Sequence, residues 1–396
     1  MREKKKRTKK RLALRIVLST IGVLLLIVVS YVIYAFASYY RLPDNIELTP
    51  KPDPGRYMTM GRKPPERIIV STEEETYTIM TYNIGFGAYT PDYSFFMDGG
   101  KYSWARSKDG LIQNLKDIAN MITDSDPDFV LLQEVDEDGT RSRHVCEVNY
   151  MCAMDYYQHV YAQNFDSPFL FWPLLEPHGA NKSGILTLSK AYIRSALRRS
   201  LPVSDSLSKI VDYDRCYSIS RIPLGKTTSA PYPFNGTTDP EGKELVLFNV
   251  HLSAYSTESV REAQLSMLFE DMQNEYAKGN YVICGGDFNH NLRKDSTSEN
   301  VPGWAQSFPR ESIPGAFSFG FETSATGSGK PAPVVNIAHD SCRNADEAYD
   351  PQTTFTVLAD GFIVSDNIEV VYYESIDMQY AYSDHDPVIM EFSLKD

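Results

Sequence analysis

Near its N-terminus the chain has an uncharged apolar segment, which spans residues 16–40 and includes the run Gly22–Val29. A segment of this length is enough for a helix to cross a hydrocarbon core of about 30 Å, so the pattern predicts one membrane-spanning helix. A cleaved signal peptide is the alternative, since Ala35-Phe36-Ala37 resembles a small-x-small cleavage site. The apolar stretch is longer than the core of a usual signal peptide, which favours a retained anchor.

The rest of the chain alternates short apolar runs with longer connections. Alternating or continuous apolar runs predict strands at residues 76–82, 129–132, 245–250, 281–284, 361–364 and 387–392. Apolar residues at helical spacing predict one helix over 107–123 and a second that ends near Lys278, with Gly279 as its stop. No glycine-rich phosphate loop follows any of these strands, so we expect a layered α/β sandwich rather than a doubly wound nucleotide-binding fold.

Composition fits one large folded domain behind this anchor. The chain has 396 residues, of which 42% are hydrophobic and 23% charged, and this excludes a disordered protein. We therefore divide it into a basic cytoplasmic tail (1–15), a transmembrane anchor (16–40), a proline-rich linker (41–70) and one globular domain (71–396). The linker is expected to be an extended spacer that holds the domain away from the bilayer.

Charge is distributed unevenly between the two ends of the anchor. Nine of the first 15 residues are Lys or Arg, whereas Arg41 stands alone just after the apolar segment. The positive-inside rule then predicts a cytoplasmic N-terminus and an extracytoplasmic domain. Since residues 1–16 contribute +8 to the net charge of −13, residues 17–396 carry −21. An acidic body of this kind is a poor binder of long polyanions, so any phosphate chemistry would have to rely on a metal ion.

Polar residues follow or precede nearly every predicted strand. They are Asn83, Gln133-Glu134, His251, Asp287-Phe288-Asn289 and Ser383-Asp384-His385-Asp386. If these strands share a sheet, the side chains converge at one rim, where α/β folds build their sites. Carboxylate and amide oxygens are hard ligands, so the pattern favours Mg²⁺, with Mn²⁺ or Ca²⁺ as alternatives, over structural zinc.

At this point the sequence resembles the endonuclease/exonuclease/phosphatase superfamily, which includes deoxyribonuclease I, abasic-site endonucleases, neutral sphingomyelinases and inositol-polyphosphate 5-phosphatases. The resemblance covers about residues 76–394. It rests on the order and spacing of Thr81–Ile84, Leu132–Val135, Asn249–Leu252, Gly286–Asn289, Asp360 and Ser383–Pro387. It implies a four-layer α/β/β/α sandwich of the deoxyribonuclease I type and a metal-dependent hydrolase of phosphoester bonds.

The resemblance also implies roles for individual residues. Glu134 looks like the principal metal ligand, with Asn83 beside it and Asp384 completing the carboxylate cluster. Asp360 looks like the partner that fixes the tautomer of His385. His385 either takes a proton from the attacking water or holds the phosphate. Asp287 is the alternative group that could align or deprotonate the water. Two further residues look like donors to the non-bridging phosphate oxygens, namely Asn289 and His251.

The substrate is less sharply defined by the sequence. Arg141, Arg143 and Asn164 are candidates to bind phosphate or head-group oxygens. The aromatic regions 89–104 and 165–175 either pack loops onto the sheet or form an apolar rim that faces lipid. A small phosphoester, a lipid head group and a nucleic acid therefore stay open as substrates. A nuclease of the same fold and a non-catalytic surface binding module are the alternative functions, and no protein partner is implied.

Overall fold

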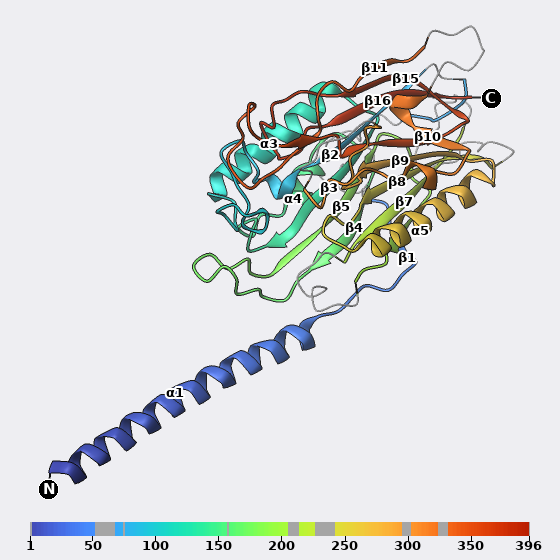
Figure 1. Cartoon of the computed structure of the whole chain (residues 1–396). Coiled ribbons are helices and arrows are strands. Elements are labelled where there is room, and N and C mark those ends of the chain that lie inside the picture. The colour runs from blue at the N-terminus through green and yellow to red at the C-terminus, as the bar shows by residue number, and fades with distance from the viewer. Residues whose placement is uncertain are drawn as a thin grey trace, which may run out of the picture.

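Two β-sheets packed face to face form the centre of the body, and one long helix projects away from it (Figure 1). The computed structural model describes residues 2–51, 68–73, 76–156, 158–204, 214–225, 242–294, 302–323 and 332–395. Within these residues each main sheet has seven strands. A small two-stranded sheet pairs β12 (Cys342–Arg343) with β13 (Thr356–Val357).

The first main sheet, called sheet B, contains the first predicted strand of the domain. Its strand order is β11 (Val334–Asn336), β15 (Ile368–Ser375), β16 (Val388–Leu394), β2 (Tyr77–Asn83), β3 (Phe129–Gly139), β5 (Asn181–Ser189) and β4 (Gln158–Asp166). β2 and β3 run parallel, because α3 (Lys108–Ser125) returns the chain between them. The Ser107 side chain accepts a hydrogen bond from the Gly110 amide and so caps the start of this helix.

The second main sheet, called sheet A, has a related plan. Its strand order is β1 (Ile46–Leu48), β6 (Ser195–Ser200), β7 (Cys216–Pro223), β8 (Glu244–His251), β9 (Tyr281–Asp287), β14 (Asp360–Ser365) and β10 (Phe317–Phe319). β8 and β9 form its parallel pair, connected by α5 (Glu258–Tyr276). Each sheet therefore has one parallel pair at its centre, and the carboxyl ends of β2, β8 and β9 carry Asn83, His251 and Asp287.

Three apolar clusters hold the layers together. Side chains of both sheets meet between them, including Ile79 and Leu131 from sheet B and Ile283 from sheet A. A second cluster packs α3 on the outer face of sheet B, and a third packs α5 on the outer face of sheet A. Figure 1 shows these two helices on opposite sides of the body. The predicted four-layer α/β/β/α sandwich is thereby confirmed.

The inter-sheet core gives a stability prediction. Replacing the fully buried Ile283 by Ala is expected to lower the free energy of unfolding by about 2–5 kcal/mol, because the lost methyl groups leave a cavity. Urea denaturation of the detergent-solubilised chain, followed by tryptophan fluorescence, measures this change. Val371→Ala on β15 is the control, since its side chain is 38% exposed and should matter by less than about 0.5 kcal/mol. Equal effects of both substitutions would contradict the assigned core.

The N-terminal helix α1 (Arg2–Ser38) is longer than the predicted anchor. It includes most of the segment expected as a basic tail, and it ends two residues before the predicted boundary at residue 40. By length and composition Lys9–Ser38 could cross a membrane, and none of its most apolar stretch is buried against the body. The 30 residues span about 45 Å at the α-helical rise, which exceeds the hydrocarbon core.

Part of the expected spacer belongs instead to the body. Ile46–Leu48 forms β1 and pairs with β6 at the edge of sheet A, and Arg41 forms an ion pair with Asp214 at 2.6 Å. The prediction of an extended spacer is therefore wrong for residues 41–51. The short run Ile46–Leu48 between the prolines forms a strand that pairs with the edge of sheet A at β6, which would otherwise be unpaired. Residues 52–67 of the predicted linker lie outside the described residues.

Several strands had no clear sequence signal. β4, β5, β6 and β7 were not predicted, and buried polar residues explain this, since Asn164, Ser183 and Arg198 interrupt the apolar pattern. The described residues of the stretch 290–356, which showed no periodicity, form short elements. They are η4 (Arg310–Ser312), β10, η5 (Gly320–Glu322), β11, β12 and the start of β13.

Candidate active site

Strand pairing brings the polar residues to one edge of the two sheets. In sheet A the register places Asp287 beside His251 of β8 and beside Asp360 of β14. In sheet B, Asn83 is the last residue of β2. It pairs with Gln133 of β3, the residue just before Glu134. The Asn83 amide donates to the Asp287 carboxylate at 3.1 Å, which joins the two sheets across the core. The predicted convergence of strand ends is thus what the structure shows.

The glycine before Asp287 makes this close pairing possible. Gly286 has φ +150°, and a Cβ there would lie 2.0 Å from the backbone oxygen of Val250 on β8. Any side chain at this position would push β8 and β9 apart. The Gly285-Gly286 pair therefore lets the strand end bring Asp287 close to its neighbour.

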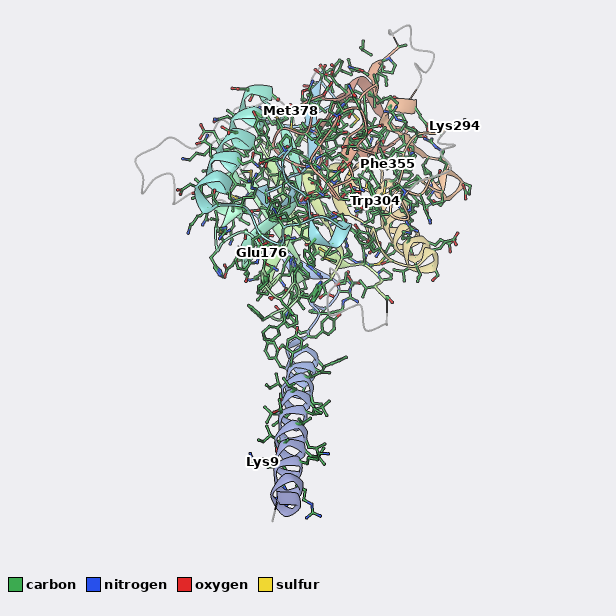
Figure 2. The ribbon with its side chains drawn as sticks, turned by 60° about the vertical axis from the view of Figure 1, so that its left-hand side comes forward. Lys9, Glu176, Lys294, Trp304, Phe355 and Met378 are labelled. Carbon is green, nitrogen blue, oxygen red and sulfur yellow. The ribbon has the colours of Figure 1, made fainter. Side chains whose placement is uncertain are left out.

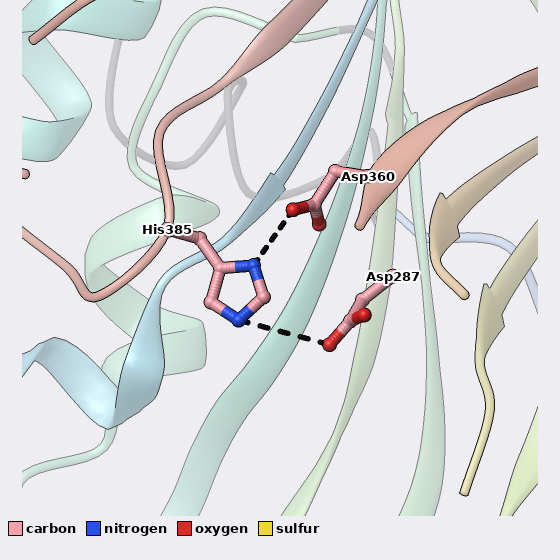
Figure 3. A group of neighbouring side chains, drawn as sticks. All are labelled: Asp287, Asp360 and His385. Atoms are coloured by element: carbon pink, nitrogen blue, oxygen red, sulfur yellow. Dashed lines mark hydrogen bonds and ion pairs between the residues drawn. The ribbon is translucent and has the colours of Figure 1, made fainter. Parts of the chain in front are cut away.

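His385 lies between two carboxylates (Figure 3). Its Nδ1 is 2.7 Å from Asp360 Oδ2, and its Nε2 is 3.8 Å from Asp287 Oδ2. The Ser341 hydroxyl donates to the same Asp360 oxygen at 2.8 Å, and so fixes the orientation of the carboxylate. Because Asp360 binds the Nδ1–H, the Nε2 atom is the one presented toward Asp287.

The charges of this group are strongly coupled. Burial alone would lower the pKa of His385, but the carboxylates of Asp360 and Asp287 raise it well above the usual range. Burial raises the pKa of Asp287 to about 7, and the nearby His385 acts in the opposite direction. The protonation states of His385 and Asp287 therefore depend on each other.

Glu134 occupies a bulge in β3. The strand loses its register with β5 between Leu132 and Val135, and Glu134 has φ +54°, in the left-handed region. A residue other than glycine in this region costs about 1–3 kcal/mol, and such strain is concentrated at functional positions. Arg141 Nη1 lies 3.6 Å from the Glu134 carboxylate, which helps to hold it at the cavity.

Carboxylates gather on the same cavity wall. Glu134, Asp384 and Asp98 all line a cavity of about 110 Å³, together with Asp287 and His385. Burial raises the pKa of Asp384, and the charge of Glu134 acts in the same direction. Burial also raises the pKa of Asp98 to about 6. These carboxylates repel one another, so a bound cation would stabilise the cluster.

The donor set fits a hard divalent cation. Glu134 and Asp384 offer carboxylate oxygens, and within the described residues the Asn83 side-chain oxygen accepts one hydrogen bond, from the Gly85 amide at 3.0 Å. All three are oxygen ligands of the type that Mg²⁺ prefers. No cysteine or histidine cage of the kind that structural zinc needs occurs among these ligands.

Asn289 and His251 both line the cavity and both contact Asp287. The Asn289 amide donates to the Leu252 oxygen at 2.8 Å and to Asp287 Oδ2 at 3.1 Å, so both of its hydrogens face protein. His251 Nε2 lies 3.5 Å from the same Asp287 oxygen, and burial lowers the pKa of His251 well below its usual range. In this structure both side chains contact Asp287, although both also line the cavity.

Sequence comparison decides the relationship. The sequence model of the Endonuclease/Exonuclease/phosphatase family matches residues 80–385, which is most of the chain and includes every strand end described above. The chain belongs to this family. No curated protein matches it by sequence.

Several solved structures resemble this chain. An endonuclease/exonuclease/phosphatase from Beutenbergia cavernae has a TM-score of 0.50 and 15% identity, over 81% of this chain and 72% of that one. One from Bacteroides vulgatus has a TM-score of 0.48 and 15% identity, over 81% and 100%. A mannosyl-6-phosphatase from Bacteroides thetaiotaomicron has a TM-score of 0.48 and 17% identity, over 80% and 100%.

Family membership makes the chain a phosphoesterase-type protein, since members are metal-dependent hydrolases of phosphoester bonds.

One of the three predicted substrate-binding residues lies on the cavity wall, namely Arg141. Its Nε and Nη2 donate to the buried Asp136 at 3.1 and 2.8 Å, which leaves Nη1 to face Glu134. The sequence pattern could not distinguish this buried arginine from one on the surface.

Arg143 and Asn164 do not reach the cavity within the described part of this family fold. Arg143 donates to the backbone oxygens of Ala105 and Arg106, at 2.7 and 3.2 Å, so it holds a loop. Asn164 is fully buried in β4. Arg143 and Asn164 are therefore near the aromatic regions in sequence but do not line the cavity.

Sequence reasoning missed other side chains that line the cavity, including Asp98, Tyr255, Arg215, Cys342 and Arg343. Asp98 ends η2 (Phe96–Asp98), within an aromatic loop where no strand end marks it, and it accepts a hydrogen bond from the Tyr255 hydroxyl. Cys342 Sγ lies 3.4 Å from His385 Nε2. For Asp98, the only signal in the sequence was that an acidic residue stands among aromatic ones.

Proposed function

We propose that this protein is a membrane-anchored, Mg²⁺-dependent phosphoesterase whose catalytic domain lies outside the cytoplasm. The observation that supports this most is the Asp360–His385–Asp287 group, in which His385 and Asp287 line the same cavity as Glu134 and Asp384. Separated acidic and imidazole groups of this kind provide both a place for a cation and a proton acceptor.

The proposed chemistry is in-line attack of water on phosphorus. When bound by Glu134, Asn83 and Asp384, Mg²⁺ supplies charge neutralisation at the phosphate and at the leaving oxygen. The water oxygen bonds to phosphorus while the bond between phosphorus and the leaving oxygen breaks. His385 Nε2 and Asp287 Oδ2 are 3.8 Å apart, so we assign the water proton to this pair rather than to one group.

Neighbouring side chains keep the pair in place. Asp360 holds the Nδ1–H of His385, while Asn83 and Asn289 donate to Asp287 Oδ2, each at 3.1 Å. Because Asn83 ends a strand of sheet B and Asp360 begins a strand of sheet A, both sheets hold the pair in place. Such fixed geometry lowers the reorganisation needed at the moment of reaction.

The charge pattern around α1 supports the proposed location. Lys and Arg dominate the residues before the apolar stretch, and Arg41 alone follows it closely. This asymmetry favours a cytoplasmic N-terminus, which places the catalytic domain on the other side of the membrane. The acidic body favours small phosphoesters or lipid head groups over long nucleic acids.

Metal dependence tests the proposal. Detergent-solubilised full-length protein should hydrolyse bis-p-nitrophenyl phosphate with Mg²⁺, lose turnover to background in EDTA and regain it with excess Mg²⁺. A panel of plasmid DNA, RNA, sphingomyelin and inositol phosphates assigns the substrate class. Turnover that EDTA leaves unchanged would contradict the metal-dependent mechanism. A folded protein with no turnover on any substrate would favour the binding module.

A further inference from the structure

The loop between β4 and β5 exposes an unusual number of large apolar side chains. This β4–β5 loop, residues 167–180, exposes Phe171 by 53%, Trp172 by 67%, Leu174 by 76% and Leu175 by 100%. Glu176 is its only carboxylate, and it has no Lys or Arg. A contiguous exposed patch of this type marks a surface that contacts something other than water.

The loop lies against α1. The Tyr31 hydroxyl donates to the Phe169 backbone oxygen at 3.1 Å, and the Tyr34 hydroxyl accepts from the Phe169 amide at 3.1 Å. The Tyr31 and Phe171 rings also meet edge to face, with centroids 4.7 Å apart. Figure 2 shows Glu176 of this loop close to the end of α1 that joins the body, far from Lys9.

The contact extends down the apolar surface of the helix. Leu26, Ile27 and Ser30 of α1 share a groove with Phe169 and Phe171 of the loop. Tyrosine and tryptophan prefer the level of the lipid head groups, with aliphatic side chains deeper. The two tyrosines on α1 therefore mark the outer membrane interface, and the loop reaches the same level.

The base of the loop is part of the active site. Phe165, just before the loop, and His178, near the end of the loop, both line the catalytic cavity. The Trp104 indole donates to the Pro177 oxygen at 2.6 Å, and Leu170 pairs with Gly179. A displacement of the loop tip would thus be transmitted to the cavity wall.

We infer that the β4–β5 loop is a second membrane contact, which inserts Trp172, Leu174 and Leu175 into the outer leaflet beside α1. The inference rests on the proposed function in one respect, since it takes α1 as the membrane anchor. Lipid is the occupant because the groove is continuous with helix positions that a bilayer must cover. The loop lacks Lys and Arg, so its insertion is hydrophobic and does not need anionic lipid.

Quenching by brominated lipid tests the insertion. Full-length protein is reconstituted into phosphatidylcholine vesicles with or without bromine on the acyl chains, after flotation has shown that it is membrane-bound. We expect bromolipid to quench part of the tryptophan emission and Trp172→Phe to lose that quenching. Trp304→Phe is the matched control and should keep it, because Trp304 lies at the catalytic cavity.

The outcomes separate the loop from the rest of the proposal. If the protein floats but bromolipid quenches wild type and Trp172→Phe equally, the inserted loop is refuted and the anchor is not. Failure to float would overturn the anchor and the loop with it. Neither readout uses catalysis, so a protein that floats and is quenched at Trp172 but hydrolyses nothing would refute only the phosphoesterase proposal. Phenylalanine keeps an aromatic ring at position 172, which preserves the loop fold.

Discussion

Glu134→Gln is expected to reduce kcat/KM for phosphoester hydrolysis by about 10²- to 10⁴-fold, because a lost metal ligand removes several kcal/mol of transition-state stabilisation. The side chain keeps its shape but loses the charge that Mg²⁺ requires. The strained bulge that presents Glu134 is unchanged by this substitution. The measurement is steady-state hydrolysis of bis-p-nitrophenyl phosphate across a Mg²⁺ titration, and the variant should also need more Mg²⁺ for half-maximal rate.

Glu137→Gln provides a control on the same strand. Its carboxylate is 44% exposed and pairs with Lys182 at 2.7 Å, away from the cavity-lining residues of the described chain. We expect its kcat/KM to stay within about twofold of wild type, since exposed ion pairs contribute little. If both variants behaved alike, or if Glu134→Gln kept full activity, the cation would bind elsewhere.

His385→Ala is expected to lower kcat by about 10²- to 10⁴-fold, which is the usual contribution of a positioned acid or base. The substitution also leaves the Asp360 and Asp287 carboxylates buried without the imidazole between them. KM should change far less than kcat, because in the proposed mechanism the His385–Asp287 pair acts on the attacking water rather than on substrate binding. Steady-state kinetics with Mg²⁺ in excess separates the two constants.

His144→Ala is the matched control for this second substitution. The His144 side chain is 67% exposed, and its hydrogen-bond partner within the described residues is Asp138, at 2.7 Å. Its removal should leave both constants unchanged. A large rise in KM with an unaltered kcat in His385→Ala would mean that His385 holds the phosphate and that Asp287 alone takes the proton.

The sequence was most informative where a strand meets a polar residue. Asn83, His251 and Asp287 were found because each directly ends an apolar run, and sheet register then brings strand ends together. The pairing of Asp360 with His385 came from the family resemblance, since the two are 25 positions apart and no local pattern links them. Fold class followed from the same strand order and its connecting helices.

What the sequence could not supply is long-range packing. Arg141 looks like any charged residue, yet it is 2% exposed because Asp136 offers it two bonds inside the protein. Asp98 has no strand beside it and reaches the cavity through a 3-10 turn. Arg143 lies two positions from Arg141, but the left-handed backbone at Arg143 turns it toward another loop. Such differences depend on contacts between distant segments.

The short connection between α1 and sheet A has a kinetic consequence. Only residues 39–45 separate the helix from β1, and Tyr40 and Arg41 bind Asp166 and Asp214 at 2.5 and 2.6 Å. A domain anchored through α1 is therefore held at one height above its own bilayer. For any substrate embedded in that bilayer, turnover should follow the surface density of the substrate in two dimensions. Diluting the vesicles in buffer would leave the rate per enzyme unchanged, whereas diluting the substrate with inert lipid would lower it.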